Sequence, residues 1–323
     1  MRVTTGVMVD NMMRNLQKNI KRLDEYNRQL ASGKKFENPS QNPIGAINSM
    51  SLKSSLANSE QYIKNIESAK DWLNNTESLL NSQGDILQRA RELAVRAAND
   101  TMDDSDREYV QEEIKELRDE LINIANSQIA GKYIFAGQMT KGEKSPFDDS
   151  ESVNGVKFKG DNKEIKREIG AGIEMVINID GEEAFKKAIN TLRGFEELLG
   201  DEDLSGNGKG NVYDDIDGDG IGDPESDFSV ELEDFSDVIG QIDDLIDDNL
   251  QHRAQVGAKV NRLELSLNRT EDNKLHTRET LSKNEDVDIA EVITELKMQE
   301  SIYRASLAVG ARIIQPSLVD FIK

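Results

Sequence analysis

The stretch DVDIAEVITELKMQESIYRASLAVGARIIQPSLVDFIK covers residues 286–323 and carries the clearest helical pattern of the chain. Steps of four and three give one line of mostly apolar residues: Ile289, Ile293, Leu296, Glu300, Tyr303, Leu307, Gly310 and Ile314. This spacing is typical of a helix that packs lengthwise against another helix. The chain then closes on the apolar residues Leu318, Val319, Phe321 and Ile322. The segment is therefore expected to need a partner.

A matching line of apolar residues lies near the other end of the chain. It consists of Met8, Met12, Leu16, Ile20, Leu23 and Leu30, and Gly33 stands where a helix commonly ends. One interpretation is an ordinary coiled coil between the two ends of one chain. The other is that the same residues also contact other chains in an assembly. The predicted assembly interface comprises Met8, Met12, Leu16, Ile20, Leu23, Leu30, Ile289, Ile293, Leu296, Tyr303, Leu307, Ile314, Leu318 and Phe321.

The segments between these ends predict more long helices and a small insert. A helix is expected over residues 44–99, with a seam at Leu52, Leu56, Ile63, Ile66, Leu73, Leu80, Leu87 and Ala94 and with Trp72 beside it. Further helices are expected from about residue 105, over 182–199 and over 228–284. β-branched and alternating pieces at 133–137, 156–160 and 174–179 predict short antiparallel strands.

The predicted fold class is mainly α with a small β-rich insert (α+β). The N- and C-terminal regions are expected to form a long antiparallel helical coiled-coil rod, with an outer domain inserted between them. The expected divisions are an N-terminal helical segment (1–139), a β-rich outer insert (140–200), an acidic Asp/Gly region of that insert (201–237) and a C-terminal helical segment (238–323).

The charge of the chain is strongly negative and unevenly distributed. The formal net charge is −22, which argues against binding to nucleic acid or to an anionic membrane surface. Residues 201–250 contain 18 Asp and Glu against the single Lys209, so this segment carries −17 of that charge. The sequence has no stretch that resembles a membrane span or a cleaved signal peptide, so membrane insertion is not expected.

The densest group of carboxylates predicts a calcium loop. Asp215, Asp217 and Asp219 occupy loop positions one, three and five, Gly220 provides the sharp turn and Asp223 stands at position nine. Position twelve is a serine, so the closing carboxylate would come from Asp227 or Glu225. The expected ligands of a structural Ca²⁺ are Asp215, Asp217, Asp219, Asp223 and Asp227. A solvated acidic loop without a metal remains the alternative.

The residue types give no support for an enzyme. The chain has no cysteine and only two histidines, His252 and His276, which are expected at the surface. Without a cysteine and with two histidines far apart in the sequence, no nucleophile–base pair can be assembled.

Several short motifs, in a fixed order, resemble the flagellin family. They are Leu30-Ala-Ser-Gly-Lys-Lys35, Arg253-Ala-Gln-Val-Gly-Ala258, Asn261-Arg-Leu-Glu264 and Tyr303-Arg-Ala-Ser-Leu307. Residues 132–147, the start of the last helix at 288–299 and the close at 318–322 look more like the family's hook–filament junction proteins than like its filament subunits. The resemblance covers residues 1–145 and 238–323. The acidic pair usual after the first turn is replaced by Gln41 and Asn42.

The resemblance implies a structural protein of the bacterial flagellum, exported through the flagellar type III apparatus without a cleaved signal peptide. It implies a ring of subunits with the first hook-associated protein on the hook side and flagellin on the filament side. It also implies an export chaperone that holds the C-terminal helix. A filament subunit is the nearest alternative, and a calcium-dependent coiled-coil surface protein is a more distant one.

Overall fold

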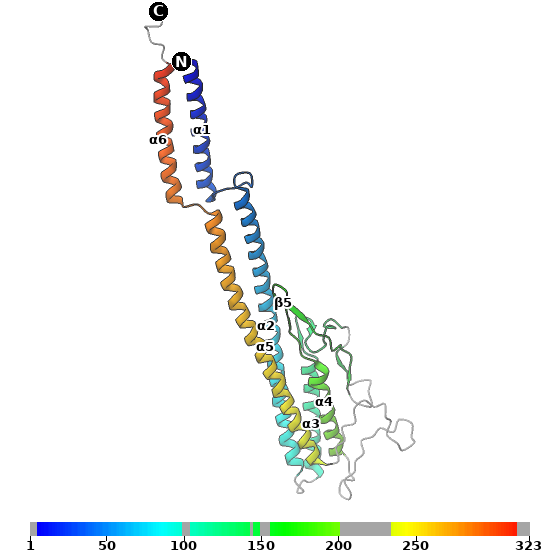
Figure 1. Ribbon diagram of the computed structural model, residues 1–323. Coiled ribbons are helices and arrows are strands. Elements are labelled where there is room, and N and C mark those ends of the chain that lie inside the picture. Colours follow the sequence, from blue (N-terminus) through cyan, green and yellow to red (C-terminus); the bar gives the residue numbers. More distant parts are fainter. Residues whose placement is uncertain (1–4, 99–103, 143–144, 149–155, 201–233, 315–323) are drawn as a thin grey trace, which may run out of the picture. The chain divides into compact units, whose positions relative to one another are not determined.

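The computed structural model describes residues 5–98, 104–142, 145–148, 156–200 and 234–314, and within these ranges the chain is mainly helical (Figure 1). The predicted fold class, mainly α with a small β-rich insert, is confirmed. The helices are α1 (Thr5–Ser32), α2 (Pro43–Ala97), α3 (Asp104–Ala125), the π-helix η1 (Glu182–Lys186), α4 (Lys187–Gly200), α5 (Phe235–Glu285) and α6 (Ile289–Ile314).

Polar side chains and one glycine fix the helix ends. Asn42 precedes α2 and accepts a hydrogen bond from the Gly45 amide at 3.0 Å, while Pro43 takes the first helical position, which requires no amide donor. Asp288 caps α6 by accepting from the Ala290 amide at 2.9 Å. Gly33 ends α1 with φ +69°, a left-handed conformation that glycine adopts without strain.

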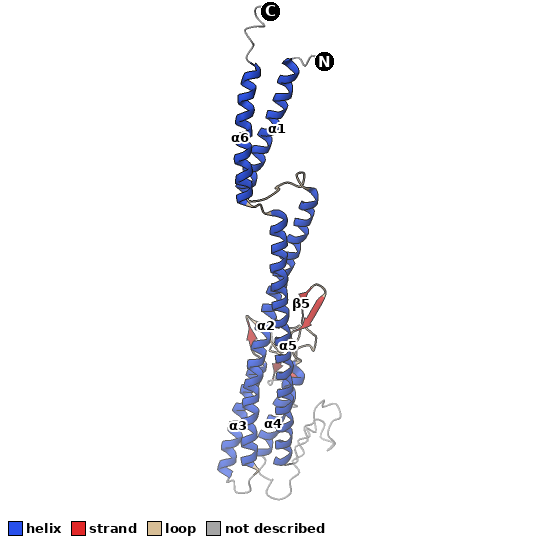
Figure 2. Cartoon of the chain, turned by 60° about the vertical axis from the view of Figure 1, so that its left-hand side comes forward, coloured by secondary structure: helices blue, strands red, loops and turns tan. Residues whose placement is uncertain are grey.

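The chain divides into two compact units. Unit 1 contains residues 1–60 and 271–323, and unit 2 contains residues 61–270. In unit 1, α1 and α6 lie side by side (Figures 1 and 2). The first part of α2 contacts the last part of α5, as shown by the ion pair between Glu60 and Lys274 at 3.2 Å.

Unit 2 is built around the remaining part of α2. Its predicted seam is confirmed there, because Ile66, Leu73, Leu80, Leu87 and Ala94 are fully buried at seven-residue intervals. Helix α5 packs against this part of α2, and α3 packs against α4.

Within the described residues, six short strands form three separate antiparallel pairs rather than one sheet. The pairs are β1 (Gln128–Ile129) with β2 (Lys132–Tyr133), β3 (Phe147–Asp148) with β4 (Lys157–Phe158), and β5 (Lys166–Gly170) with β6 (Ile173–Val176). Aromatic side chains pack together near these strands, and the ring centroids of Phe135 and Phe185 are 4.6 Å apart.

Several predictions in unit 2 are wrong in detail. The strands expected over 156–160 and 174–179 span only Lys157–Phe158 and Ile173–Val176. The strand expected over 133–137 ends at Tyr133; the chain then bends, and Gly137 turns it with φ +61° at a site where a Cβ would collide with the Asp161 carbonyl. His252 is only 8% exposed rather than at the surface, because α5 is covered on that side. The acidic residues predicted to bind calcium, Asp215 to Asp227, lie outside the described residues.

Candidate assembly interface

The pairing of α1 with α6 defines the first part of the candidate interface. The seam of α1 consists of half-buried side chains at alternating steps of three and four: Val9, Met12, Leu16, Asn19, Leu23, Tyr26 and Leu30. The facing residues of α6 are Val292, Leu296, Gln299, Tyr303, Ser306 and Gly310. A Cβ at Gly310 would lie 1.9 Å from Met12 Cε, so this glycine leaves room for the end of the Met12 side chain.

The centre of this seam is polar. Gln299 is 5% exposed and its Nε2 donates to Asn19 Oδ1 at 3.1 Å. Asn19 Nδ2 in turn donates to Ser306 Oγ at 3.3 Å. A polar pair inside a coiled-coil seam fixes the alignment of the two helices at some cost in stability. The hydrogen bonds thus specify which residues of α1 and α6 face each other.

The predicted seam of α6 is only partly correct. Leu296, Tyr303 and Gly310 do face α1, whereas Ile289, Ile293 and Leu307 are 57%, 41% and 44% exposed. Two neighbouring lines of residues run along α6, and the one that faces α1 includes Val292 and supplies Gln299 and Ser306 to the hydrogen bonds with Asn19. The pattern in the sequence could not choose between these lines.

The predicted seam of α1 is also only partly correct. Met12, Leu16, Leu23 and Leu30 face α6 and are half-buried, whereas Met8 and Ile20 are 43% and 45% exposed. The Ile314 side chain and residues Leu318 and Phe321 lie outside the described part of the chain. The paired terminal helices therefore leave apolar side chains in contact with solvent.

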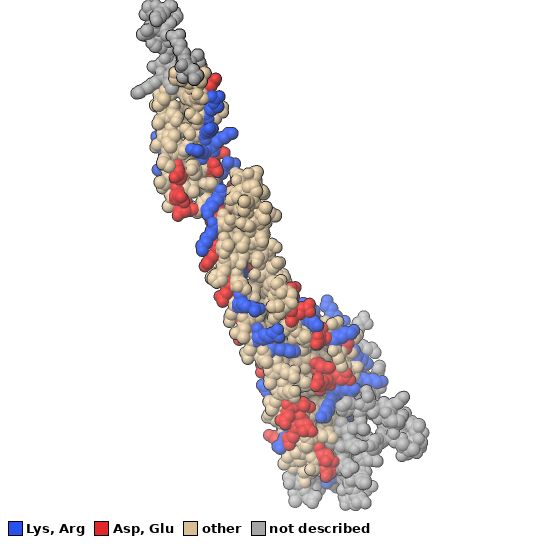
Figure 3. All heavy atoms as spheres, viewed as in Figure 1, with Lys and Arg blue, Asp and Glu red and all other residues tan. Residues whose placement is uncertain are grey.

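A further apolar surface was not predicted from the sequence. At the start of α2, Ile44, Ile47 and Met50 are 75%, 67% and 68% exposed. Their three-residue spacing places them on one side of the helix. Figure 3 shows few charged side chains over this part of α2. On α6, the large apolar side chains of Met298, Ile302 and Val309 are exposed as well. The three-residue spacing of Ile44, Ile47 and Met50 is visible in the sequence, but this spacing does not distinguish a buried side of a helix from an exposed one.

The connection from α1 to α2 and the connection from α5 to α6 are joined by an ion-pair cluster. The Glu285 carboxylate is 8% exposed and lies 2.6 Å from Lys34 Nζ and 2.8 Å from Lys53 Nζ. Although burial opposes its ionisation, the hydrogen bonds from the two lysines hold the pKa of Glu285 below its ordinary value. The bond to Glu285 likewise raises the pKa of Lys34.

Backbone and amide contacts strengthen this connection. The Lys35 amide donates to the Glu285 carbonyl at 2.7 Å, and the Val287 amide donates to the Gly33 carbonyl at 3.1 Å. Asn284 Nδ2 donates to the Gly45 carbonyl at 2.9 Å and to Ser49 Oγ at 2.7 Å. Glu285 therefore supplies the carboxylate that links the α1–α2 connection to the α5–α6 connection.

Gln41 and Asn42 replace the acidic pair that the resemblance leads one to expect. Gln41 Oε1 accepts from the Glu37 amide at 2.8 Å, and Asn42 caps α2. Both side chains therefore stabilise the local turn.

Within the described residues, no group of His, Asp and Glu is arranged to hold a metal ion. No described helix is both long and apolar enough to cross a membrane.

Comparison with known proteins identifies the family. The model of the bacterial flagellin N-terminal helical region matches residues 3–140, and that of the flagellin C-terminal helical region matches residues 239–322. The matched regions contain both terminal helices and all of α2, α3 and α5 apart from the first residues of α5. The chain therefore belongs to the flagellin family and is a structural protein of the flagellar axis.

Within this family the similarity extends to hook-associated proteins. Flagellar hook-associated protein 3 of Escherichia coli is 28% identical over 95% of this chain and 95% of its own length. The protein of the same name from Salmonella typhimurium is 31% identical over 57% of each chain. The structure of a putative flagellar hook-associated protein from Vibrio parahaemolyticus has the same fold, with a TM-score of 0.62 at 21% identity over 76% of this chain and all of that one. The resemblance to the family's hook-associated members is confirmed.

Proposed function

We propose that this chain is a non-catalytic adaptor that joins the hook-associated zone of the flagellum to the flagellin filament. The observation that carries the proposal is the α1–α6 pair, whose polar seam leaves Ile289, Ile293 and Leu307 exposed. Exposed apolar side chains along a helix favour contact with other chains. The similarity to hook-associated protein 3 over nearly the whole length supports the junction rather than another part of the axis.

The proposed neighbours follow from that position. The first hook-associated protein would lie on the hook side, flagellin on the filament side, and further copies of this chain would complete a ring. Before assembly, the apolar line of α6 would need a cover, which is the role proposed for an export chaperone. The protein would leave the cell by the flagellar export apparatus without a cleaved signal peptide and act outside the cell at the junction.

Imaging tests the position directly. A fluorescent label on the protein in intact flagella should give one spot between the hook and the filament. A signal along the whole filament would contradict the junction and support the second candidate, a filament subunit. That candidate is favoured by one observation, namely that both matching family models are those of flagellin itself.

A deletion tests the role of the terminal helix. Removal of residues 288–323 should abolish incorporation into flagella, because α6 supplies half of the α1–α6 pair. Unit 2 should stay folded, since its core residues all lie within 61–270. Filaments that still form with this deletion would rule the proposal out.

Calcium binding is a separate proposal for the acidic segment. Asp215, Asp217, Asp219, Asp223 and Asp227 offer the carboxylate oxygens that Ca²⁺ prefers, and the ion would be structural. Isothermal titration of the whole protein with Ca²⁺, compared with Asp217→Asn/Asp219→Asn, tests it. Equal heats for the two proteins would favour a solvated acidic loop. A calcium-dependent surface protein would additionally require that Ca²⁺ change its binding to a partner.

A further inference from the structure

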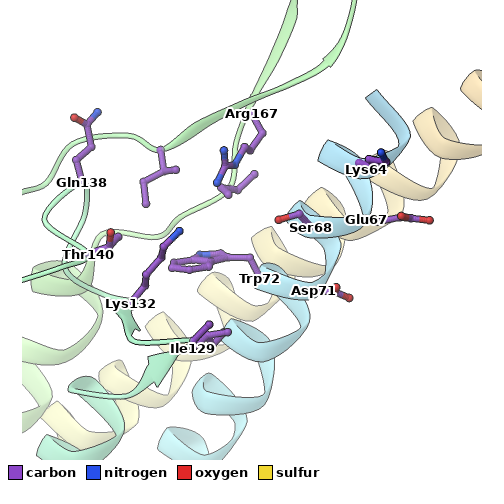
Figure 4. Close-up of a pocket in the computed structure, with 13 residues that line it drawn as sticks. Lys64, Glu67, Ser68, Asp71, Trp72, Ile129, Lys132, Gln138, Thr140 and Arg167 are labelled. Carbon is purple, nitrogen blue, oxygen red and sulfur yellow. The ribbon is translucent and has the colours of Figure 1, made fainter. Parts of the chain in front are cut away.

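A cavity of about 620 Å³ lies within unit 2 between α2, the β1–β2 hairpin and the β5–β6 hairpin (Figure 4). Its apolar lining comes from Trp72, Ile129, Ile165 and Ile177. A cavity of this size is in the range that holds small organic molecules. None of its lining residues belongs to α1 or α6, the helices of the assembly interface described above.

Three residues with cationic side chains, Lys64, Lys132 and Arg167, line the cavity. Lys132 and Arg167 extend toward the Trp72 ring from β2 and β5 (Figure 4). Within the described part of the chain, neither of them forms an ion pair with a carboxylate. Glu67 and Asp71 also border the cavity, but their carboxylates point away from it on the other side of α2 (Figure 4). A protein with a net charge of −22 thus presents two unpaired cations at one hollow.

The Trp72 indole adds a donor without a partner. Its Nε1 is shielded from solvent and has no hydrogen-bond acceptor. A buried donor that lacks an acceptor is unfavourable, typically by about 1–3 kcal/mol. Figure 4 shows the Lys132 side chain lying beside the indole, and a long flexible side chain can move to admit a ligand that offers an acceptor.

The wall opposite Trp72 is held by hydrogen bonds. Gln138 Nε2 donates to the Glu164 carbonyl at 2.9 Å, and the Tyr133 amide donates to the Thr140 carbonyl at 2.9 Å. The first bond joins the loop after β2 to the segment before β5, and the second holds this loop to β2. The cavity is therefore formed before any ligand binds, which lowers the entropic cost of binding.

We propose that this cavity binds a small organic anion that combines a carboxylate with a planar apolar ring. The ring would stack against Trp72 among the isoleucines, and the carboxylate would pair with Lys132 and Arg167. The indole Nε1–H and the Ser68 and Thr140 hydroxyls are further donors at the site. An organic cation would meet Lys132 and Arg167 without a facing carboxylate, so the charge favours an anion.

Trp72 is the only tryptophan of the chain, so its fluorescence reports on this cavity alone. Dansyl-glutamate is a suitable probe because the dansyl ring accepts energy from tryptophan and the glutamate supplies carboxylates. Titration of the full-length protein should quench Trp72 with saturation, and dansylamide, which lacks the carboxylates, should bind at least tenfold more weakly. Raising the salt concentration should weaken the binding of dansyl-glutamate more than the binding of dansylamide.

Substitution of both cations provides the second arm. Lys132→Met/Arg167→Met should weaken the binding of dansyl-glutamate at least tenfold and leave the binding of dansylamide unchanged. Lys157→Met removes a lysine that does not line the cavity, and it should bind as the unaltered protein does. Circular dichroism should confirm that all three proteins are folded. Equal affinity for the two probes, or full affinity in the double variant, would overturn the proposal. The proposal would also be overturned if Trp72 were quenched only when subunits assemble, because that result would mean that a neighbouring chain occupies the cavity.

Discussion

The Glu285 carboxylate accepts a hydrogen bond from the Lys34 ammonium at 2.6 Å, although 251 positions separate the two residues in the chain. Lys34 follows α1 and Glu285 ends α5, so this bond joins the two connections that lead to the terminal helices. It adds to the backbone hydrogen bonds from Lys35 to Glu285 and from Val287 to Gly33, which join the same two connections.

We expect Glu285→Gln to loosen this connection. The substitution removes the charge that pairs with Lys34 and Lys53, but both lysines are more than 40% exposed and can return to water. The loss should be about 1 kcal/mol. Amide hydrogen exchange of residues 283–292 should become faster. Glu271→Gln, an exposed carboxylate on the same helix, should leave this exchange unchanged, and an equal effect of both substitutions would contradict the prediction.

The same ion pair predicts a dependence on pH. The pKa of Glu285 is lower in the folded protein than in the unfolded chain, so its contribution is complete above the unfolded value of about 4.5. The contribution is lost as the pH falls through the folded pKa. The difference in unfolding free energy between the unaltered protein and Glu285→Gln should therefore be constant from pH 7 to pH 5 and shrink at lower pH. A difference that grows on acidification would show that the sign is wrong.

The hydrogen bond between Asn19 and Gln299 predicts energetic coupling between α1 and α6. Asn19→Ala and Gln299→Ala should each destabilise the helix pair by about 0.5–1.5 kcal/mol. The double variant should cost less than the sum, because each single substitution already breaks the shared bond. Hydrogen exchange across residues 5–32 provides the measurement. As a control, Asn19→Ala with Thr294→Ala should be additive, since the exposed Thr294 bonds only to its own helix.

The exposed line of α6 predicts a separation of folding from assembly. Ile293→Gln/Leu307→Gln should leave the helical content of the isolated protein unchanged, because both side chains are already more than 40% exposed. Incorporation into flagella should fall sharply. Ser301→Gln, at an exposed position of α6 away from this line, should be incorporated normally. Normal incorporation of the Ile293/Leu307 double variant would exclude this line from the interface.

A buried amide network in unit 2 predicts a large loss of stability. Asn249 Nδ2 donates to the Leu80 carbonyl at 2.9 Å and to Gln83 Oε1 at 3.0 Å, and Gln83 Nε2 donates to the Ala184 carbonyl at 2.7 Å. Asn249→Ala leaves two buried acceptors without their donor and should cost about 1–3 kcal/mol in denaturant unfolding. The exposed Asp248→Ala should stay within about 0.5 kcal/mol. A negligible effect at Asn249 would mean that water replaces the amide.

The sequence by itself determined where the helices lie and that the two ends of the chain pair. Apolar residues at seven-residue intervals from Ile66 to Ala94 lie along one side of a long helix, and these positions are buried. The family was also readable, because several short motifs occur in a fixed order although the identity to the Escherichia coli relative is only 28%.

Only the tertiary structure decided which apolar line of α6 faces α1. Ile293 and Val292 are neighbours in the chain and equally apolar, and the choice between them follows from the room that Gly310 leaves for the Met12 side chain and from the hydrogen bond from Gln299 to Asn19. The cation pair beside Trp72 was equally invisible, because Lys132, Arg167 and Trp72 come from three elements that meet only in the folded chain. Helical periodicity is a local property of the sequence, whereas the choice of packing partner depends on the shapes of both surfaces.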